Sequence, residues 1–224
     1  MTLLLEALRV VVPGRILFDH LDLSIVSGQS VAVLGSSGSG KTTLLNTAAG
    51  IRKPSSGSVW FAGADLFASS AASRSRTRLS SMGLIFQFSE LLPELTVVEN
   101  VALPLRLAGR TKGDATEAAV THLEALGLAD AAGRPTTTLS GGEQQRVGIA
   151  RATVHGPRLI LADEPTGMLD DANSDLVMEL MLAQVAEIGA ALLLVTHDTR
   201  VGSMADESYN ASDGGLEPVT RFRS

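Results

Sequence analysis

The chain has 224 residues, 45% of them hydrophobic, so it is long enough for one large domain or two small ones with a substantial core. Its 24 acidic and 18 basic residues give a net charge of −6, which offers no broad basic surface for nucleic acid. The absence of cysteine excludes disulfides, thiolate catalysis and thiolate metal sites.

The first two predicted elements are antiparallel strands. Apolar and polar residues alternate over residues 3–12 and again over 16–26, and the turn residues 13–15 separate the two runs. The first residues include an acid and lack a basic leader, so we expect no signal peptide. Purely apolar runs such as 190–195 are far shorter than the roughly 20 residues of a membrane helix, and work at a membrane would therefore require docking onto a partner.

A glycine-rich loop is the most informative stretch of the chain. An apolar run rich in β-branched residues, 30–34, precedes the loop, and a helix-compatible run, 44–49, follows it. The loop fits the phosphate-binding pattern G-x-x-x-x-G-K-[ST]. Its fixed positions are occupied by Gly35, Gly40, Lys41 and Thr42. A flexible glycine–serine linker is the alternative, but a linker has no reason to lie between a buried strand and a helix.

The residue types of this loop suit a nucleotide polyphosphate. Glycines let successive backbone N–H groups turn toward an anion, and the following helix adds its positive N-terminal end. Lys41 would place its charge on the β and γ phosphates, and the Thr42 hydroxyl would ligate Mg²⁺. The predicted nucleotide-binding residues of the loop are Gly35, Ser36, Ser37, Gly38, Ser39, Gly40, Lys41, Thr42 and Thr43.

The middle of the chain changes from strand to helix. Short strands are predicted at 59–62 and at 82–86, the second ending on Gln87, and the basic run 74–78 between them is interpreted as a solvated helix face. From about residue 89 to 157 the pattern is helical, which predicts an inserted helical subdomain. Its segments are 97–107, interrupted by Pro104, then 114–126 and 142–153.

Apolar strands return at 158–162 and 190–195, on either side of a long predicted helix at 171–188. Parallel-type strands joined by helices predict an α/β doubly wound core. The first of these strands runs into Asp163 and Glu164, and ligands of open α/β sheets bind at the carboxyl ends of strands. We therefore expect Asp163 on the Mg²⁺ side and Glu164 as the base for the attacking water. An acidic helix cap is the alternative.

The stretch from Ser140 to Glu143 predicts a helix start. A glutamate three residues after a serine forms a capping box, with two glycines between them here. Exposed N–H groups, a hydroxyl and the helix dipole would also favour a second anion site. The residues alone leave both interpretations open.

Residues 139–144 resemble the signature motif of ATP-binding cassette (ABC) proteins. The order of motifs, from the phosphate loop through Gln87 and the signature to the acidic pair and His197, resembles the ATPase subunit of an ABC transporter over nearly the whole chain. This resemblance implies an α/β P-loop NTPase core with an antiparallel β subdomain and an inserted α-helical subdomain. It implies one ABC ATPase domain, with the nucleotide-binding core at 1–87 and 158–224 and the helical subdomain at 88–157.

The resemblance also implies roles for individual residues. Gln87 would contact Mg²⁺ or the nucleophilic water, His197 would be the switch histidine at the γ-phosphate, and Asp170 matches the D-loop aspartate. A head-to-tail dimer is implied, in which the signature of one copy closes on the ATP held by the other. The signature residues are Ser140, Gly141, Gly142 and Glu143.

Two places depart from the family pattern. Val11 and Val12 stand where an aromatic residue usually stacks on adenine, so selectivity between ATP and GTP stays open. Met168 stands where relatives often have alanine or asparagine, and its effect on the contact between copies is open.

Four stretches, 86–93, 95–101, 142–146 and 164–167, resemble the ATPases of lipoprotein-release, macrolide-export and haem-export systems. Such ATPases use MgATP at the cytoplasmic face of the membrane, beneath a permease that transmits force, and no nucleic acid is expected as a partner. The implied permease contacts are Phe88, Leu91, Leu92 and Pro93. A module that recruits a membrane partner without transport, as in cell division, and a soluble ABC ATPase remain alternatives.

Overall fold

The computed structural model describes residues 1–212 and 214–219, and the strands of this part form two sheets. The first sheet has the order β2-β1-β4-β5, in which each neighbouring pair is antiparallel. The second sheet has the order β10-β9-β3-β8-β7-β6. The strands of the first sheet are β1 (Leu3–Val12), β2 (Arg15–Ile25), β4 (Ser56–Phe61) and β5 (Ala64–Asp65). Those of the second are β3 (Ser30–Leu34), β6 (Met82–Ile85), β7 (Leu159–Asp163), β8 (Ala191–Thr196), β9 (Glu207–Ser212) and β10 (Gly215–Pro218).

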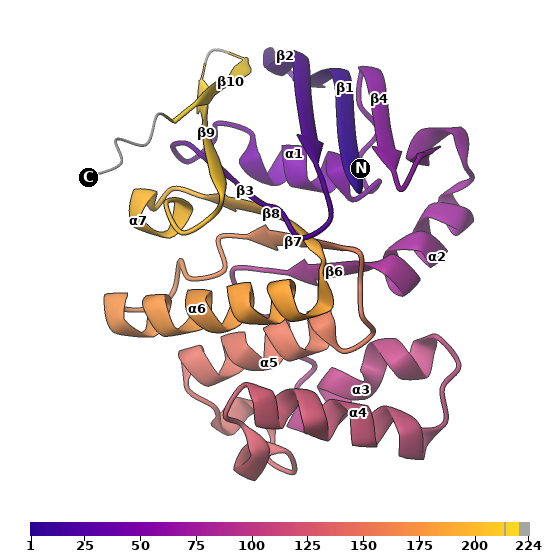
Figure 1. The fold of residues 1–224 in the computed structure, drawn as a ribbon, viewed down its shortest axis with the longest axis vertical. Helices are drawn as coiled ribbons and strands as arrows, with labels where there is room; N and C mark the ends of the chain where they lie inside the picture. Colours follow the sequence, from indigo (N-terminus) through magenta and orange to yellow (C-terminus); the bar gives the residue numbers. More distant parts are fainter. Residues whose placement is uncertain (213, 220–224) are drawn as a thin grey trace. The chain divides into compact units, whose positions relative to one another are not determined.

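The chain divides into two compact units (Figure 1). The first unit comprises Met1–Ser75, Leu161–Glu164 and the described residues from Ala191 on, and it contains the phosphate loop. The second unit comprises Arg76–Ile160 and Pro165–Ala190.

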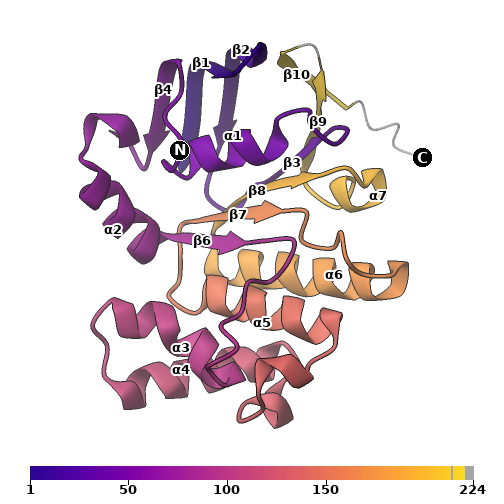
Figure 2. The same ribbon diagram turned by 180° about the vertical axis from the view of Figure 1, so that it is seen from behind.

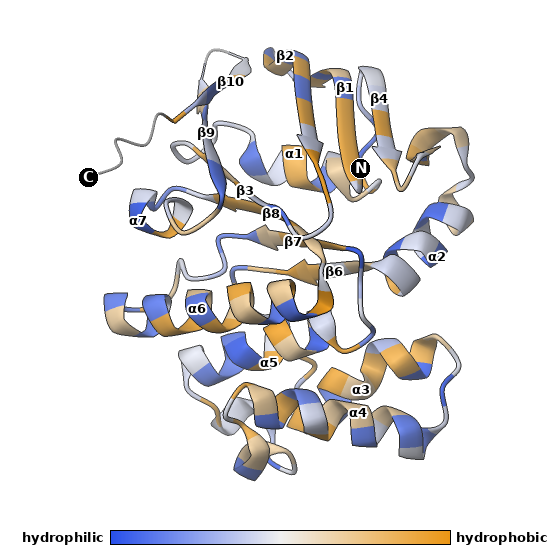
Figure 3. Ribbon diagram, viewed as in Figure 1, coloured by the Kyte–Doolittle hydropathy of each residue, from blue (hydrophilic) through white to orange (hydrophobic). Residues whose placement is uncertain are grey.

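Strands β3 and β8 form the buried centre of the first unit. Every residue of both strands is buried, and both appear hydrophobic in Figure 3. Such unbroken apolar runs are typical of parallel strands covered on both faces, as the sequence predicts. The two strands pair in parallel, from Ser30 beside Leu192 to Leu34 beside Thr196. This register brings the residues that follow Leu34 and Thr196 to the same edge of the sheet.

The first unit also contains α1 (Lys41–Ala48), the short helices η1 (Leu66–Ala68) and α7 (Thr199–Gly202), and the first part of α2 (Ala71–Ser81). Helix α1 packs on β8 and β1. It begins at Lys41, which confirms the helix start expected near this residue, and Gly40 turns the chain into it with a φ of 101°. Helix α2 carries the basic run and has no fully buried residue, which agrees with a largely solvated face. Arg74, however, is half-buried, and its side chain donates to the carbonyl oxygens of Gly50 and Ser69.

Strand β4 begins at Ser56, three residues before the predicted strand. Its second residue, Gly57, has a φ of 82°, and a Cβ there would lie 2.4 Å from the carbonyl oxygen of Ala7 in β1. Only glycine allows this close approach of the two backbones.

The helices of the second unit pack around α5 (Gly141–Thr153). Helix α6 (Asp171–Ile188) lies on one side of α5, and α3 (Val97–Leu107) and α4 (Lys112–Ala125) lie on the other (Figure 1, Figure 2). The short helices η2 (Ala129–Ala131) and η3 (Thr136–Thr138) precede α5 in the chain. These helices confirm the predicted helical segments, although α3 continues through Pro104. None of the helices in the described part of the chain combines the length and the hydrophobicity of a membrane-spanning segment.

The irregular segment between β6 and α3 is held by Asn100, whose side chain is completely buried. Its Nδ2 donates to the carbonyl oxygens of Leu92, Leu95 and Thr96 at 3.0–3.2 Å, and its Oδ1 accepts from the Leu92 N–H at 2.8 Å. One side chain thus replaces the hydrogen bonds that regular secondary structure would supply.

Replacing Asn100 with alanine should therefore lower the free energy of unfolding by about 2–3 kcal/mol, because backbone groups are left without partners. Urea denaturation followed by circular dichroism measures the change. Leu107→Ala is the control, since Leu107 lies on the same helix but is exposed, and we expect a change within about 0.5 kcal/mol there. A similar small change for Asn100→Ala would show that Asn100 does not hold the segment.

Candidate functional site

The predicted phosphate loop connects β3 to α1 in the first unit, and Lys41, Thr42 and Thr43 form the first turn of the helix. The Lys41 side chain is only 7% exposed, and its Nζ donates to the carbonyl oxygens of Gly35 and Ser36 at 2.7 and 3.1 Å. The loop also buries the Ser39 hydroxyl, which has no hydrogen-bond partner within the described structure. A buried ammonium and an unpartnered hydroxyl at a helix N-terminus suit an anionic ligand.

Glu164 follows β7 directly and has a φ of 46°, in the left-handed region that residues other than glycine rarely adopt. Its N–H donates to the carbonyl oxygen of Val195 in β8 at 2.9 Å, which anchors the turn to the neighbouring strand. Residues kept in such a conformation concentrate at active sites, where the surrounding structure enforces the strain. Ala7, His20, Ala62 and Glu90 share a positive φ, so the backbone conformation points to Glu164 only together with its side-chain contacts.

The Glu164 side chain is the centre of a polar cluster, and it is 14% exposed. Its Oε2 accepts from the Thr196 hydroxyl at 3.0 Å and from the His197 N–H at 3.2 Å, and lies 2.9 Å from His197 Nδ1. Its Oε1 lies 3.6 Å from Lys41 Nζ. The β3–β8 register and the bond from the Glu164 N–H to Val195 thus assemble a carboxylate, an imidazole and an ammonium at one edge of the sheet, as expected for chemistry at the carboxyl ends of strands.

Asp163, the last residue of β7, can hold a magnesium ion together with Thr42. Burial raises the pKa of the Asp163 carboxyl above its usual range, and a hydrogen bond with the Thr42 side chain opposes this shift. Magnesium prefers such oxygen ligands and takes one or two from protein, the rest being water and substrate phosphate. The described residues contain no group of three or more His, Asp or Glu side chains arranged as a metal site. The residues present fit a magnesium ion that a nucleotide completes.

The signature residues begin α5 in the second unit, where Ser140 is the N-cap. The Ser140 N–H and hydroxyl both donate to Glu143 Oε2, at 2.7 and 2.8 Å, and the Glu143 N–H donates back to the Ser140 hydroxyl at 3.3 Å. These hydrogen bonds hold the pKa of the Glu143 carboxyl below its usual range. The prediction of a capping box is confirmed.

Asp170 caps the next helix, α6, and lies beside the signature. Its carboxylate accepts from the Asn173 N–H and side-chain amide, each at 2.9 Å, and these bonds lower its pKa. A Cβ added to Gly142 would lie 3.3 Å from Asn173 Oδ1, and one added to Gly141 would lie 3.5 Å from the Leu169 side chain. The fold thus brings two sequence motifs, 140–143 and 167–170, together within the second unit.

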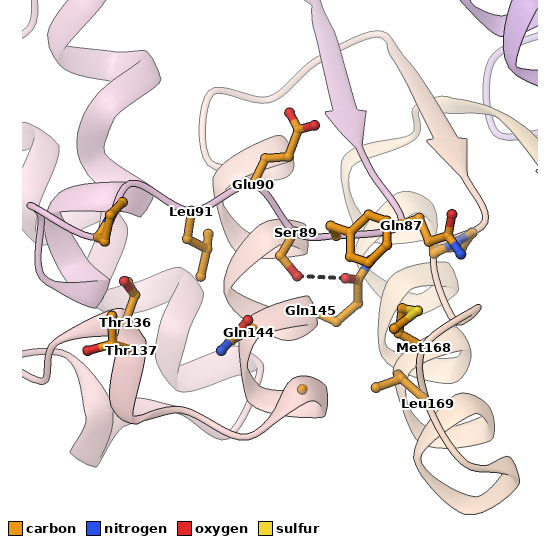
Figure 4. A pocket seen from close by; sticks show the side chains of 14 residues that line it. Gln87, Ser89, Glu90, Leu91, Thr136, Thr137, Gln144, Gln145, Met168 and Leu169 are labelled. Atoms are coloured by element: carbon orange, nitrogen blue, oxygen red, sulfur yellow. Dashed lines mark hydrogen bonds between the residues drawn. The ribbon is translucent and has the colours of Figure 1, made fainter.

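Gln87 lies just beyond β6 and lines a cavity of about 530 Å³ in the second unit (Figure 4). Figure 4 shows Met168 and Leu169 across the hollow from Ser89, whose hydroxyl donates to Gln145 Oε1 at 2.7 Å. The predicted partner residues Phe88, Leu91 and Pro93 also line this cavity, and Leu92 is exposed beside it. Met168, which departs from the family pattern, also lines this cavity and is 61% exposed.

The tip of the β1–β2 hairpin touches the phosphate loop, because Arg15 Nη1 donates to the Gly38 carbonyl oxygen at 3.2 Å. Val11 pairs with Ile16 across the hairpin, and both side chains are exposed. Val11 therefore presents an aliphatic side chain beside the loop, where the family resemblance implies an aromatic side chain.

Three residues that take part in these clusters were not identified from the sequence. Thr196 binds Glu164, Asn173 holds Asp170, and Arg134 Nη1 lies 3.5 Å from Glu143 Oε1. The sequence contains a signal that could have identified Thr196, because it is the polar last residue of an apolar strand and directly precedes His197. Arg134 carried no such signal, because it lies outside α5 and meets Glu143 only through the turn that includes η3 (Thr136–Thr138).

A family model described as ABC transporter matches residues 18–167, more than half of the chain. The lipoprotein-releasing system ATP-binding protein LolD of Treponema denticola is 42% identical to the chain over 204 residues, which cover 91% of this chain and 90% of LolD.

Solved structures agree with this match over almost the full length. A dimeric structure of MJ0796, described as a bacterial ABC transporter cassette, has a TM-score of 0.88 at 32% identity and covers 99% of both chains. A second dimeric structure of MJ0796, in a post-hydrolysis state with ADP and Pi, has a TM-score of 0.87 at 31% identity and the same coverage. Structure cbiO1 from Clostridium perfringens, part of the ABC transporter complex cbiONQ, has a TM-score of 0.87 at 27% identity, covering 96% of this chain and 86% of cbiO1.

Proposed function

Since the chain belongs to the ABC transporter family, as an ABC-type ATPase with the cassette fold, we propose that it drives a separate membrane permease of an export system. The observation that carries this proposal is the cluster of Lys41, Glu164 and His197 at the carboxyl ends of parallel strands. In this cluster the Lys41 ammonium can bind phosphate, the Glu164 carboxylate can orient and deprotonate the attacking water, and the His197 imidazole can contact the γ-phosphate.

Each side chain of the cluster has a distinct part in hydrolysis. Lys41 exchanges the carbonyl oxygens of its own loop for the β and γ phosphates of ATP. Glu164 orients the attacking water and accepts its proton, while Thr196 and His197 fix the carboxylate from the other side. Thr42 and Asp163 would hold Mg²⁺, which would neutralise charge on the phosphate oxygens, and the family resemblance adds Gln87 as a further ligand.

The proposed working form is a head-to-tail dimer. One chain carries one copy of each motif, so two chains complete two sites, and the Ser140 turn of each copy closes on the ATP of the other. The dimeric structures of the relative MJ0796, one of them with ADP and Pi, support this arrangement.

The proposed partner is an integral membrane permease on whose cytoplasmic side the ATPase is a peripheral subunit. The name of the relative LolD, a lipoprotein-releasing system ATP-binding protein, supports an export system. The resemblance of residues 86–93 and 95–101 supports a permease that transmits force. The proposed contact lies at the cavity beside Gln87, where Phe88 is 65% exposed and offers apolar area to a partner. Recruitment of a membrane partner without transport is the second candidate function.

We expect the Glu164→Gln protein to change from monomer to dimer when MgATP is added, because the variant retains nucleotide but does not hydrolyse it. Size-exclusion chromatography with light scattering measures the mass. MgADP is the control and should leave the monomer. A monomer at saturating MgATP would contradict the shared-site mechanism.

Size-exclusion chromatography with a co-expressed candidate permease in detergent, combined with a transport assay, distinguishes the two candidate functions. Co-elution together with ATP-dependent substrate movement in proteoliposomes supports the transporter. Co-elution without substrate movement supports recruitment.

A further inference from the structure

The start of α5 combines two features that oppose each other. Its N-terminal N–H groups favour an anion, and yet the Glu143 carboxylate is built into the same turn. Both the N–H and the hydroxyl of Ser140 donate to Glu143 Oε2, so the hydroxyl proton that a phosphate would use is already engaged. The hydrogen bonds from Ser140 lower the pKa of Glu143, so this carboxylate is ionised at neutral pH. A phosphate approaching the turn therefore meets a like charge.

Arg134 supplies the opposite charge at this turn. Its Nη1 lies 3.5 Å from Glu143 Oε1, the oxygen that Ser140 does not use, and its Nη2 donates to the Thr138 carbonyl oxygen at 2.8 Å. The backbone around Arg134 is also fixed, because its carbonyl oxygen accepts from the Val97 N–H at 3.0 Å. The guanidinium is thus held at the carboxylate from a rigid base.

Other charges near the turn do not take over this role. Arg146 lies on α5 and adds a smaller effect than Arg134 to the lowered pKa of Glu143. Asp170 binds the Asn173 side chain, which lies close to Gly142, so Asp170 adds a second negative charge near the turn. Without Arg134 the turn would carry an excess of negative charge toward any phosphate.

We propose that Arg134 is a positioning residue for nucleotide-dependent dimerisation, which neutralises Glu143 so that the Ser140 turn accepts the γ-phosphate of ATP held by a second copy. This inference rests on the proposed function, because it takes the partner's ATP as the occupant of the turn. It assigns Arg134 no contact with the reacting atoms, only control of the charge around Ser140.

The test measures the MgATP concentration that produces half of the dimer, by light scattering, with every variant made in the Glu164→Gln protein. Arg134→Gln should raise this concentration about tenfold, because an unneutralised carboxylate then repels the phosphate. Arg134→Lys keeps the charge and should stay within about threefold of the parent. The increase should shrink at high salt, since exposed charges are screened. MgATP binding to the monomer should not change.

Glu143→Gln supplies the double-mutant cycle. Glutamine still serves a capping box, so the helix start is kept while the charge is removed. Arg134→Gln combined with Glu143→Gln should return to within about twofold of Glu143→Gln alone, because no carboxylate is left to neutralise. Arg158→Gln is the control, since Arg158 is an exposed arginine of the same unit beyond the other end of α5, and it should have no effect.

Two results would overturn the inference. The first is dimerisation of Arg134→Gln at the parental MgATP concentration. The second is a double variant as impaired as Arg134→Gln, which would assign Arg134 to its contact with Thr138 instead. Failure of the Glu164→Gln parent itself to dimerise would instead overturn the proposed function, so the two failures are distinguishable.

Discussion

Replacing Lys41 with alanine is expected to lower the affinity for MgATP at least about 100-fold, the equivalent of roughly 3 kcal/mol. The Lys41 ammonium is buried, fixed by the Gly35 and Ser36 carbonyl oxygens and 3.6 Å from Glu164. It is therefore already in place to exchange these partners for phosphate oxygens, where charge-assisted hydrogen bonds are strong. Isothermal titration calorimetry with MgATP measures the loss.

Lys53→Ala is the matched control, because Lys53 is an exposed lysine of the same unit and its removal should leave affinity within about twofold of the wild type. The melting temperature of each variant separates lost binding from lost folding. Near-normal affinity of a folded Lys41→Ala protein would refute the assignment of 35–43 as the phosphate loop.

Replacing Glu164 with glutamine is expected to slow ATP hydrolysis by about 10²–10⁴-fold while MgATP binding is retained. Glutamine keeps the size of the side chain and an oxygen that accepts from Thr196, but its amide cannot take a proton from water. The phosphate loop and the Asp163–Thr42 pair are unchanged, so the nucleotide site persists. Phosphate release at saturating MgATP measures the rate, and calorimetry measures the binding.

Glu217→Gln, an exposed glutamate of the same unit, controls for the change in net charge and should hydrolyse ATP at the normal rate. Hydrolysis at the normal rate by Glu164→Gln would assign the base to another residue. Loss of MgATP binding would show that Glu164 chiefly holds Lys41 in place.

The two departures from the family pattern, Val11 and Met168, lie on exposed surfaces and not in the cluster around Glu164. Val11 lies on the hairpin whose Arg15 contacts the phosphate loop, and Met168 lines the cavity beside Gln87. Neither position takes part in the hydrogen bonds around Glu164. The departures therefore bear on nucleotide base selectivity and on contacts with partners, and leave the chemistry of hydrolysis in place.

The sequence by itself determined the family and most of the larger elements, whereas β5, α7, β9 and β10 were not predicted. The glycine spacing of the phosphate loop, the apolar runs at 30–34 and 190–195, and the Ser140–Glu143 capping box predict features that the structure confirms. These features are local: a strand, a left-handed glycine turn or a helix cap depends on residues a few positions apart, so the order of residues encodes them directly. The comparisons with known proteins confirm the family that the motif order indicates.

Only the tertiary structure decided which side chains meet. The β3–β8 register places Thr196 beside Leu34, and the hydrogen bond from the Glu164 N–H to the Val195 carbonyl oxygen ties the end of β7 to β8. Together they bring Glu164 within 3.6 Å of Lys41, which lies far earlier in the chain. The strained φ of Glu164 and the pairing of Arg134 with Glu143 carry no local sequence signal either. Such contacts depend on how distant segments pack and on strand register, and a pattern read along one chain does not contain that information.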